Sequence, residues 1–386
     1  MTPKSYKLLI VAGEASGDAH AADLIREMRD RDGVRQIEVF GATGPKMRAV
    51  GVETVVRADD FAVVGVPEIL RALPRFLRAY ASLFAAVRSR RPDAVVLVDF
   101  PEFNMKFARS VRRLGIPVIY FISPQLWAWR RYRLRGIKRD VDILLSIFPF
   151  EKSWYEEHGY HEVFYVGNPT SKRIAEQSNH DSSRSHIALL PGSRITEIRR
   201  ILPTMLAAAD LISVGRPDLR FRIAAASAEA KSEIESLLTA HISDSRRGTV
   251  SFSVETDSFD RIVSEASAVA VASGTATLEA ALLNTPMVVV YRSSWLNYLL
   301  LRPLISVPFF SLVNLIAGRK LAEELIQSDC SPRRLARELL SLLDPERNKD
   351  FRVQLSEVRK KLSSADDGKG AAERILEFLE SRDSVN

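Results

Sequence analysis

The stretch that decides the fold is residues 8–18, which read LLIVAGEASGD. Its first five residues are apolar and predict a buried strand, and a helical pattern begins near Asp18. Gly13 and Gly17 allow close approach of a ligand to the backbone, and the free N–H groups of a helix start favour an anion. Glu14 and Ser16 add a potential base and a hydroxyl group. The stretch predicts either a substrate-binding loop or an ordinary tight turn capped by Asp18.

Strand-like and helix-like segments alternate on both sides of a polar segment at residues 176–185, as expected of two parallel α/β sheets. Before it we expect strands at 7–12, 37–41, 94–99, 117–122, 143–147 and 163–166, and helices at 21–31, 68–90 and 103–114. After it we expect strands at 187–190, 221–225, 250–253, 268–272 and 287–291, and helices at 197–214, 229–239, 258–267 and 275–283. The prediction is two Rossmann-like domains facing across a cleft, residues 1–175 and 186–330, with helices in 331–386 crossing back to the first domain.

Composition narrows the class of protein. The 386 residues are 46% hydrophobic and include one cysteine, Cys330, which excludes a disulfide framework and indicates a reducing compartment. The apolar run at 8–12 is too short for a secretory signal, so we expect a cytoplasmic protein. The net charge of +7 calls for an anionic partner, either a phosphorylated substrate or a membrane, because no nucleic-acid-binding motif accompanies it.

Residues 295–316 resemble a membrane span in length, with Arg302 as their single charge. Pro303, Pro308 and two asparagines interrupt the segment, and a central arginine is costly in a bilayer. We therefore expect a buried or membrane-touching loop with short helices.

Two loops of the first half carry polar candidates. Asp99 ends a buried strand, which suits a general base, although it also fits a helix cap. Glu102 and Asn104 follow it, Glu102 as a first-turn partner of the helix dipole. The loop at 123–130, SPQLWAWR, places two tryptophans beside Arg130. The two tryptophans could form an aromatic shelf next to a phosphate-binding arginine, or they could be core residues, and the sequence favours neither interpretation.

Two loops of the second half are rich in glycine and hydroxyl residues and precede helices, which suits a pyrophosphate. The loop at 189–194 ends in Arg194, a positive charge for a departing diphosphate. The loop at 272–279 leads to Glu279, which suits a ribose diol or a helix dipole. The histidines and carboxylates form no metal-ligand pattern, so no metal is expected.

Together these segments resemble lipid-A-disaccharide synthase. The elements GEASGD at 13–18 and SPQLWAW at 123–129 are specific to that family. Further matching segments occur in the family's order at 64–68, 99–104, 149–152, 165–169, 189–194, 273–279 and 314–319. The chain differs from the family's usual pattern at Asn168, where His is usual, at Val313, where Pro is usual, and in the element at 323–327.

The resemblance implies a GT-B glycosyltransferase that joins UDP-2,3-diacylglucosamine to 2,3-diacylglucosamine 1-phosphate, with inversion, to give a β-1,6 disaccharide and UDP. It implies no metal and no cofactor. Asp99 is the expected base, with Glu14 as second choice. The expected acceptor-side residues are Ser16, Gly17, Asn104, Gln125, Trp127 and Arg130. The expected UDP-binding residues are Gly192, Ser193, Arg194, Ser273, Gly274, Thr275, Thr277, Glu279, Asn314 and Arg319.

Acylated substrates imply a peripheral protein at the inner face of the inner membrane, and a homodimer is a further expected partner. The helix at 69–87 has one apolar face and arginines on another, which suits interfacial docking or ordinary packing. Two other functions remain open. One is an enzyme like UDP-N-acetylglucosamine 2-epimerase, and the other is a non-catalytic nucleotide-sugar-binding protein.

Overall fold

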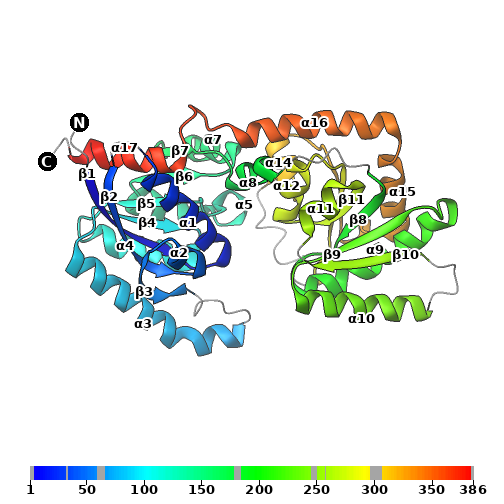
Figure 1. Ribbon diagram of the computed structural model, residues 1–386, viewed down its shortest axis with the longest axis horizontal. Helices are drawn as coiled ribbons and strands as arrows, with labels where there is room; N and C mark the ends of the chain where they lie inside the picture. Colours follow the sequence, from blue (N-terminus) through cyan, green and yellow to red (C-terminus); the bar gives the residue numbers. More distant parts are fainter. Residues whose placement is uncertain are drawn as a thin grey trace. The chain divides into compact units, whose positions relative to one another are not determined.

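The computed structural model describes residues 4–31, 34–58, 66–177, 184–244, 250–256, 258–295 and 307–383. The chain divides into two compact units, residues 1–169 with 364–386, and residues 170–363. Each unit has its own parallel β-sheet, so the two Rossmann-like domains expected from the sequence are confirmed (Figure 1). The chain passes from the first unit to the second between Pro169 and Thr170, and the predicted boundary lay at 175.

The first unit contains a seven-stranded parallel sheet in the order β3-β2-β1-β4-β5-β6-β7. The order reverses between β1 and β4, and the crevice at the carboxyl ends of two such strands is where α/β folds bind ligands. The strands are β1 (Lys4–Ala12), β2 (Val34–Thr43), β3 (Glu53–Arg57), β4 (Ala94–Val98), β5 (Val118–Phe121), β6 (Ile143–Ser146) and β7 (Val163–Tyr165).

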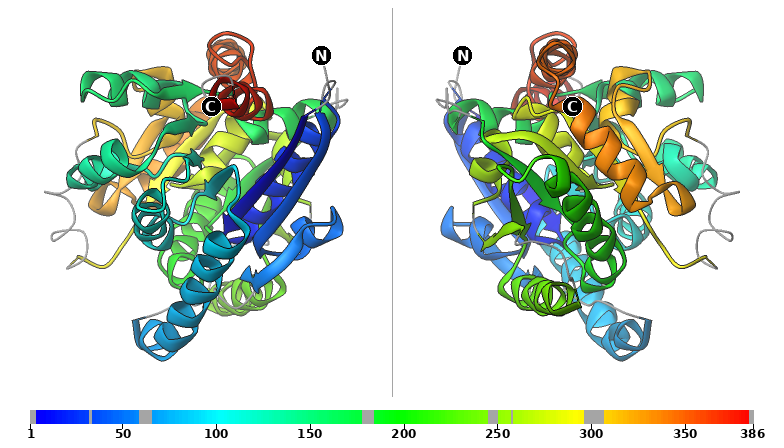
Figure 2. Two further views of the ribbon diagram at one scale, coloured as in Figure 1. Left: turned by 90° about the vertical axis from the view of Figure 1, so that its left-hand side faces the viewer. Right: turned by 90° about the vertical axis from the view of Figure 1, so that its right-hand side faces the viewer.

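Continuous apolar runs form β4 and the second half of β1 because both faces of the sheet are covered there. Leu8 and Ile10 enter one core cluster and Leu9 and Val11 the other. Helices flank both faces (Figure 2). They are α1 (Ala15–Arg29), α2 (Pro45–Ala49), α3 (Val66–Arg90), α4 (Pro101–Arg112), α5 (Leu126–Trp129), α6 (Leu134–Asp140), α7 (Pro149–Glu157) and α17 (Ala371–Asp383).

The last helix, α17, packs beside α1 on the first unit's sheet (Figure 1). Its buried residues Ala372, Ile375 and Leu379 recur at helical spacing and join the core cluster that contains Leu8. Burial of each large apolar side chain contributes roughly 1.5–3 kcal/mol. Of the C-terminal helices expected to return to the first unit, α17 does so, whereas residues 331–363 belong to the second unit.

The second unit contains a six-stranded parallel sheet in the order β10-β9-β8-β11-β12-β13, with its own reversal between β8 and β11. The strands are β8 (His186–Leu190), β9 (Arg220–Ala225), β10 (Ser251–Thr256), β11 (Ala266–Ala272), β12 (Met287–Tyr291) and β13 (Glu323–Ile326). The helices are α8 (Pro169–Gln177), which begins at the boundary, α9 (Ile195–Gly215), α10 (Ala228–Asp244), α11 (Phe259–Ser264), α12 (Thr275–Leu282), α14 (Leu312–Ala317), α15 (Pro332–Leu342) and α16 (Pro345–Ser363).

Three sequence predictions need correction or completion. Helix α1 begins at Ala15 rather than near Asp18 or Ala21, because the small residues after Glu14 already adopt helical geometry. The edge strands β3 and β13 were not predicted, and both are short and only partly buried. In the segment 295–316, residues 296–306 lie outside the described residues, and α14 is one of the expected short helices. Within the described parts of the chain, no helix is long and apolar enough to cross a bilayer.

Candidate active site

The loops after β1 and β4 lie side by side at the reversal of the first sheet. The register pairs Ala12 with Val98, so Gly13 and Asp99 follow at adjacent strand ends. The ring of Phe100 packs against Gly13, and a Cβ atom built on Gly13 would lie 2.3 Å from that ring. Glycine is required here because the two loops approach so closely.

Asp99 and Phe100 both adopt left-handed backbone conformations, with φ of 48° and 47°. Such conformations cost free energy in non-glycine residues and cluster at functional sites. Two hydrogen bonds hold the Asp99 carbonyl, one from the Tyr120 hydroxyl at 2.7 Å and one from Asn104 Nδ2 at 2.8 Å. The strand end and these donors therefore fix the position of Asp99.

Burial raises the pKa of Asp99 from its ordinary value of 3.8 to about 6, and repulsion by Glu14 adds to the increase. A carboxylate with a pKa near 6 is ionised at neutral pH and accepts a proton more readily than an exposed aspartate. The neighbouring Glu14 is exposed at the start of α1. The structure thus brings together the two carboxylates predicted from the sequence.

Asp18 does not cap the helix that contains it. Its buried carboxylate accepts hydrogen bonds from the backbone N–H groups of Gly44, Lys46 and Met47, at 2.8–3.0 Å, and so caps α2 instead. Ser16 and Gly17 lie in the first turn of α1, where Ser16 is exposed and Gly17 is buried. The turn-capping interpretation is therefore wrong, and Asp18 joins α1 to α2.

Asn104 is fully buried in the first turn of α4. Its amide nitrogen donates to the carbonyls of Asp99 and Val98, and its Oδ1 atom has no hydrogen-bond partner among the described residues. This residue therefore positions the Asp99 backbone. Glu102, in the same turn, forms ion pairs with Arg130 and Arg133. Arg130 is thus held near the start of α4.

The two tryptophans of the loop after β5 have different environments. Trp127 is buried, donates from Nε1 to Glu151 at 2.9 Å and packs edge-on against Phe150, so it belongs to the core. Trp129 is 44% exposed, and the Arg130 guanidinium lies 3.8 Å from the centre of its ring. Gln125 is exposed at the start of α5. Of the two aromatic rings, only that of Trp129 is accessible as a shelf.

Glu151 is a buried carboxyl whose role was not predicted from the sequence, although its motif at 149–152 contributed to the resemblance. Burial raises the pKa of Glu151 to about 8, even though hydrogen bonds from Trp127, Phe148 and Ser123 oppose the increase. The Ser123 hydroxyl also bonds to that of Tyr155 at 2.9 Å. This network anchors the loop at 123–130 to α7.

In the second unit, the predicted nucleotide loops follow β8 and β11. The register pairs Leu190 with Val271, so the two loops are neighbours at the reversal of this sheet. Gly192 has φ of 111°, and a Cβ atom there would lie 2.8 Å from Glu197. Ser193 and Arg194 are exposed before α9, and Arg194 pairs with Glu197 at 3.4 Å.

The second nucleotide loop begins α12. Ser273 donates to the Phe310 carbonyl at 2.9 Å, and buried Thr277 donates to the Gly274 carbonyl at 2.8 Å. Gly274 and Thr275 are exposed, and no atom of the residues that the structure describes lies within 4 Å of the Cβ position of Gly274. This backbone is therefore accessible to a ligand.

Glu279 lies one turn into α12, where burial raises its pKa. Its nearest described cation is Arg173 of α8, at 3.9 Å, and Arg173 also forms a 2.6 Å ion pair with Asp260. The carboxyl group of Glu279 is thus only weakly compensated within the unit. Such a group is suited to hydrogen bonding with a diol, as the sequence suggested.

Asn314 and Arg319, both expected to bind UDP, have different environments. Asn314 is fully buried, its Nδ2 donates to Ala322 and Glu324, and its Oδ1 accepts from the N–H groups of Leu321 and Ala322. Because its side chain is already saturated, we assign it to shaping this loop and not to the diphosphate. Arg319 is exposed and bonds to Gln354 and Glu357 of α16, at 2.6 and 3.7 Å.

Glu324 is a further residue that sequence reasoning did not assign. It accepts hydrogen bonds from the N–H groups of Phe310 and Ser311, from the Ser311 hydroxyl and from Asn314. It therefore supports the segment whose Phe310 carbonyl holds Ser273. The only indication in the sequence that Glu324 matters was its position in the family element at 323–327.

Two Rossmann-like units, each with polar loops at its strand reversal, define the GT-B class of glycosyltransferases and related epimerases. The fold is similar to that of the glycotransferase of kitacinnamycin, with a TM-score of 0.62 and 16% identity over 98% of this chain and 99% of that one. It is also similar to a UDP-GlcNAc 2-epimerase from Neisseria meningitidis bound to UDP-GlcNAc, with a TM-score of 0.61 and 13% identity over 97% and 100% of the chains.

Sequence relatives identify the family. The lipid-A-disaccharide synthetase family model matches residues 8–373. The lipid-A-disaccharide synthase of Myxococcus xanthus is 39% identical over 383 residues, covering 97% of each chain. That of Geobacter metallireducens is 37% identical over 388 residues, covering 98% of each. The chain belongs to the lipid-A-disaccharide synthase family, which makes it a glycosyltransferase of lipid A biosynthesis.

Proposed function

We propose that the protein transfers 2,3-diacylglucosamine from UDP to the 6-hydroxyl of 2,3-diacylglucosamine 1-phosphate. The products are the β-1,6-linked disaccharide 1-phosphate and UDP. Two observations support these substrates: the chain belongs to this family, and it contains the family's specific motifs at 13–18 and 123–129. An α-linked donor and a β-linked product require inversion, which one in-line displacement provides.

Asp99 is the proposed general base, and the observation that carries this proposal is its raised pKa at a fixed strand end beside Glu14. The Asp99 carboxylate accepts the proton of the acceptor hydroxyl as the oxygen attacks the anomeric carbon. The bond to UDP breaks at the same time, and UDP leaves with the electron pair. Burial is the main cause of the raised pKa of Asp99, and repulsion by Glu14 adds to it. Glu14 is the second candidate for the base.

The second unit is proposed to hold UDP. The exposed backbone at Gly274 and Thr275 precedes α12, and Ser193 and Arg194 precede α9, so both loops present N–H groups and hydroxyls to a diphosphate. Arg194 is largely exposed and its pairing with Glu197 is long, so it is available to stabilise the leaving group. The carboxyl of Glu279 would accept hydrogen bonds from the ribose diol. No metal ion is required in this scheme.

Acylated substrates imply that the protein works at the cytoplasmic surface of the inner membrane as a peripheral protein. Tyr132 is 71% exposed and lies within the basic segment 130–139, and Trp129, directly before that segment, is 44% exposed. Aromatic side chains beside cations suit a lipid–water interface. On α3, Ala79, Leu83 and Val87 pack in the core. Leu77 is 62% exposed next to Arg75 and Arg78, so this part of α3 suits docking.

Product analysis with both proposed substrates tests the function. We expect disaccharide 1-phosphate and UDP in equal amounts, and no UDP release without the acceptor. UDP-N-acetylglucosamine supplied alone serves as the control for an epimerase. Epimerisation of that sugar, or UDP release without a disaccharide, would contradict the proposed transfer.

A further inference from the structure

The second unit contains an open pocket of about 610 Å³ at the amino ends of its strands. Arg184 lies just before β8, Arg216 and Asp218 lie just before β9, and Lys349 and Arg352 come from the first turns of α16. The nucleotide loops follow the carboxyl ends of β8 and β11. This pocket therefore lies at the opposite ends of the strands of the same sheet. The proposed transfer reaction makes no use of it.

The charge of this pocket is strongly unbalanced. Four cationic side chains line it, and Asp218 is its one carboxylate among the described lining residues. Asp218 is already bound by Arg216 through two hydrogen bonds, of 3.1 and 3.0 Å. Arg184, Lys349 and Arg352 have no ion pair with a described carboxylate, so three positive charges face the pocket without compensation.

Two of these cations are partly buried and bonded only to neutral groups. Arg184 donates to the carbonyls of Ala266 and Leu283 and to the Thr285 hydroxyl. Arg352 donates to Asn348 Oδ1 and to the Asn284 carbonyl. Burial and repulsion by Arg352 lower the pKa of Arg184 to about 10. Partial burial of two neighbouring guanidinium groups without a carboxylate is costly, and a bound anion would offset that cost.

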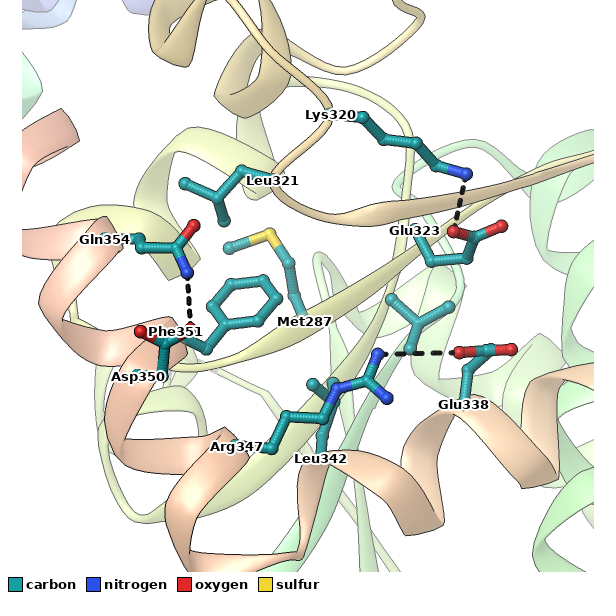
Figure 3. Close-up of a pocket in the computed structure, with 11 residues that line it drawn as sticks. Met287, Lys320, Leu321, Glu323, Glu338, Leu342, Arg347, Asp350, Phe351 and Gln354 are labelled. Carbon is teal, nitrogen blue, oxygen red and sulfur yellow. Dashed lines mark hydrogen bonds and ion pairs between the residues drawn. The ribbon is translucent and has the colours of Figure 1, made fainter.

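A second pocket, of about 290 Å³, lies against the other side of α16 and provides a contrast (Figure 3). Its two cations each face a carboxylate, Lys320 with Glu323 at 2.6 Å and Arg347 with Glu338 at 3.8 Å. Asp350 accepts from Gln354 at 2.6 Å. Each cation there has a carboxylate partner, so of these two pockets only the larger has an excess of positive charge.

We propose that the pocket between Arg184, Lys349 and Arg352 binds a small phosphate-bearing molecule. Phosphate oxygens accept the charge-assisted hydrogen bonds that these side chains can donate. A volume of about 610 Å³ falls within the range of small-molecule sites and exceeds what a bare phosphate fills. The ligand is therefore a phosphate ester, either a soluble monoester or the headgroup of a lipid.

Calorimetric titration of the full-length protein with inorganic phosphate and with glycerol 3-phosphate tests the site, in low salt and with UDP present at saturation. We expect saturable binding that persists with UDP and is tighter for the ester. Lys349→Glu should weaken it roughly 10- to 100-fold, since a charge-assisted hydrogen bond is lost. Lys349 is exposed and makes no hydrogen bond within the described residues, so this variant should fold. Arg352→Gln should weaken binding similarly.

Lys231→Glu is the matched control, because Lys231 is a partly exposed lysine of α10 outside the pocket. It carries the same charge change and should alter phosphate affinity less than about twofold, because salt screens distant exposed charges. Sedimentation with phosphatidylglycerol and phosphatidylcholine vesicles separates the two sources. Ester binding without Lys349-dependent sedimentation indicates a soluble ligand, and Lys349-dependent sedimentation indicates a headgroup.

Absence of saturable binding, or equal affinities in the parent and Lys349→Glu, would overturn the proposal. Equal losses in Lys349→Glu and Lys231→Glu would also overturn it, since they would show a general charge effect. None of these results depends on glycosyl transfer. The phosphate-binding proposal can therefore be refuted without affecting the proposed glycosyl transfer, and the proposed transfer can be refuted without affecting phosphate binding.

Discussion

Replacing Asp99 with asparagine should abolish most of the activity while stabilising the protein. The variant keeps the size of the side chain, and asparagine tolerates the left-handed conformation at φ of 48°. It cannot accept the acceptor proton, so kcat should fall roughly 10²- to 10⁴-fold. UDP affinity should not change, because the proposed nucleotide contacts come from residues of the other unit.

The effect on stability follows from the pKa of Asp99, which is about 6 in the folded protein against an ordinary value of 3.8. Between these values the folded state binds more protons than the unfolded chain, so stability falls as pH rises. Above pH 6 the ionised Asp99 lowers the free energy of unfolding by its full amount, which is at most roughly 3 kcal/mol at 1.36 kcal/mol per pKa unit. Asparagine carries no such penalty. Asp99→Asn should therefore be more stable than the parent at pH 7, and this advantage should disappear near pH 4.

The pH dependence of kcat/KM and urea unfolding at pH 4 and pH 7 provide the two measurements. In the parent, kcat/KM should rise with pH through about 6 as Asp99 ionises in the free enzyme. Glu14→Gln is the control, since removing the repulsion should shift this rise to lower pH. Near-normal turnover of Asp99→Asn would refute its role as base and favour Glu14. Lower stability of that variant at pH 7 would refute the electrostatic argument.

Four further predictions concern other parts of the chain. Arg194→Ala should weaken UDP binding by about 1.5–3 kcal/mol in a calorimetric titration, and an unchanged affinity would remove Arg194 from the site. Activity should persist in excess chelator, and a loss reversed by added divalent metal would contradict the metal-free scheme. Arg75→Ser with Arg78→Ser should reduce sedimentation with anionic vesicles, most clearly at low salt, with UDP affinity as the control. Glu151→Gln should raise stability more at pH 8 than at pH 5, because burial raises the pKa of Glu151 from 4.5 to about 8, and between these values the unfolded parent loses a proton that the folded parent keeps, which lowers the parent's stability as pH rises; a pH-independent effect would contradict this.

Most of the core architecture could be predicted from local sequence. Residues 8–12 of β1 and all of β4 are continuous apolar runs, as expected of a parallel sheet that is covered on both faces. The edge strands β3 and β13 could not be predicted in this way, since they are short and partly exposed and gain their strand conformation from pairing with β2 and β12. Helix α1 was placed too late because the pattern of large apolar residues begins after its first turn of small residues.

The candidate site divides in a similar way. Asp99 and Glu14 could be identified because each follows a recognisable strand, and adjacent parallel strands place their following loops together. The two environments of Trp127 and Trp129 could not be separated, because both residues lie in the same motif. Trp127 is the buried tryptophan because its Nε1 atom donates to Glu151 of α7, a residue that is distant in the sequence.

The sequence by itself determined the two parallel α/β units, the family and the loops that carry polar groups, since these depend on local patterns and motif order. Only the tertiary structure decided the pKa of Asp99, the burial of Asn314 and the uncompensated charges around Arg184 and Arg352. Burial and electrostatic repulsion depend on distances between residues far apart in the chain, and such distances exist only once the sheets and helices have packed.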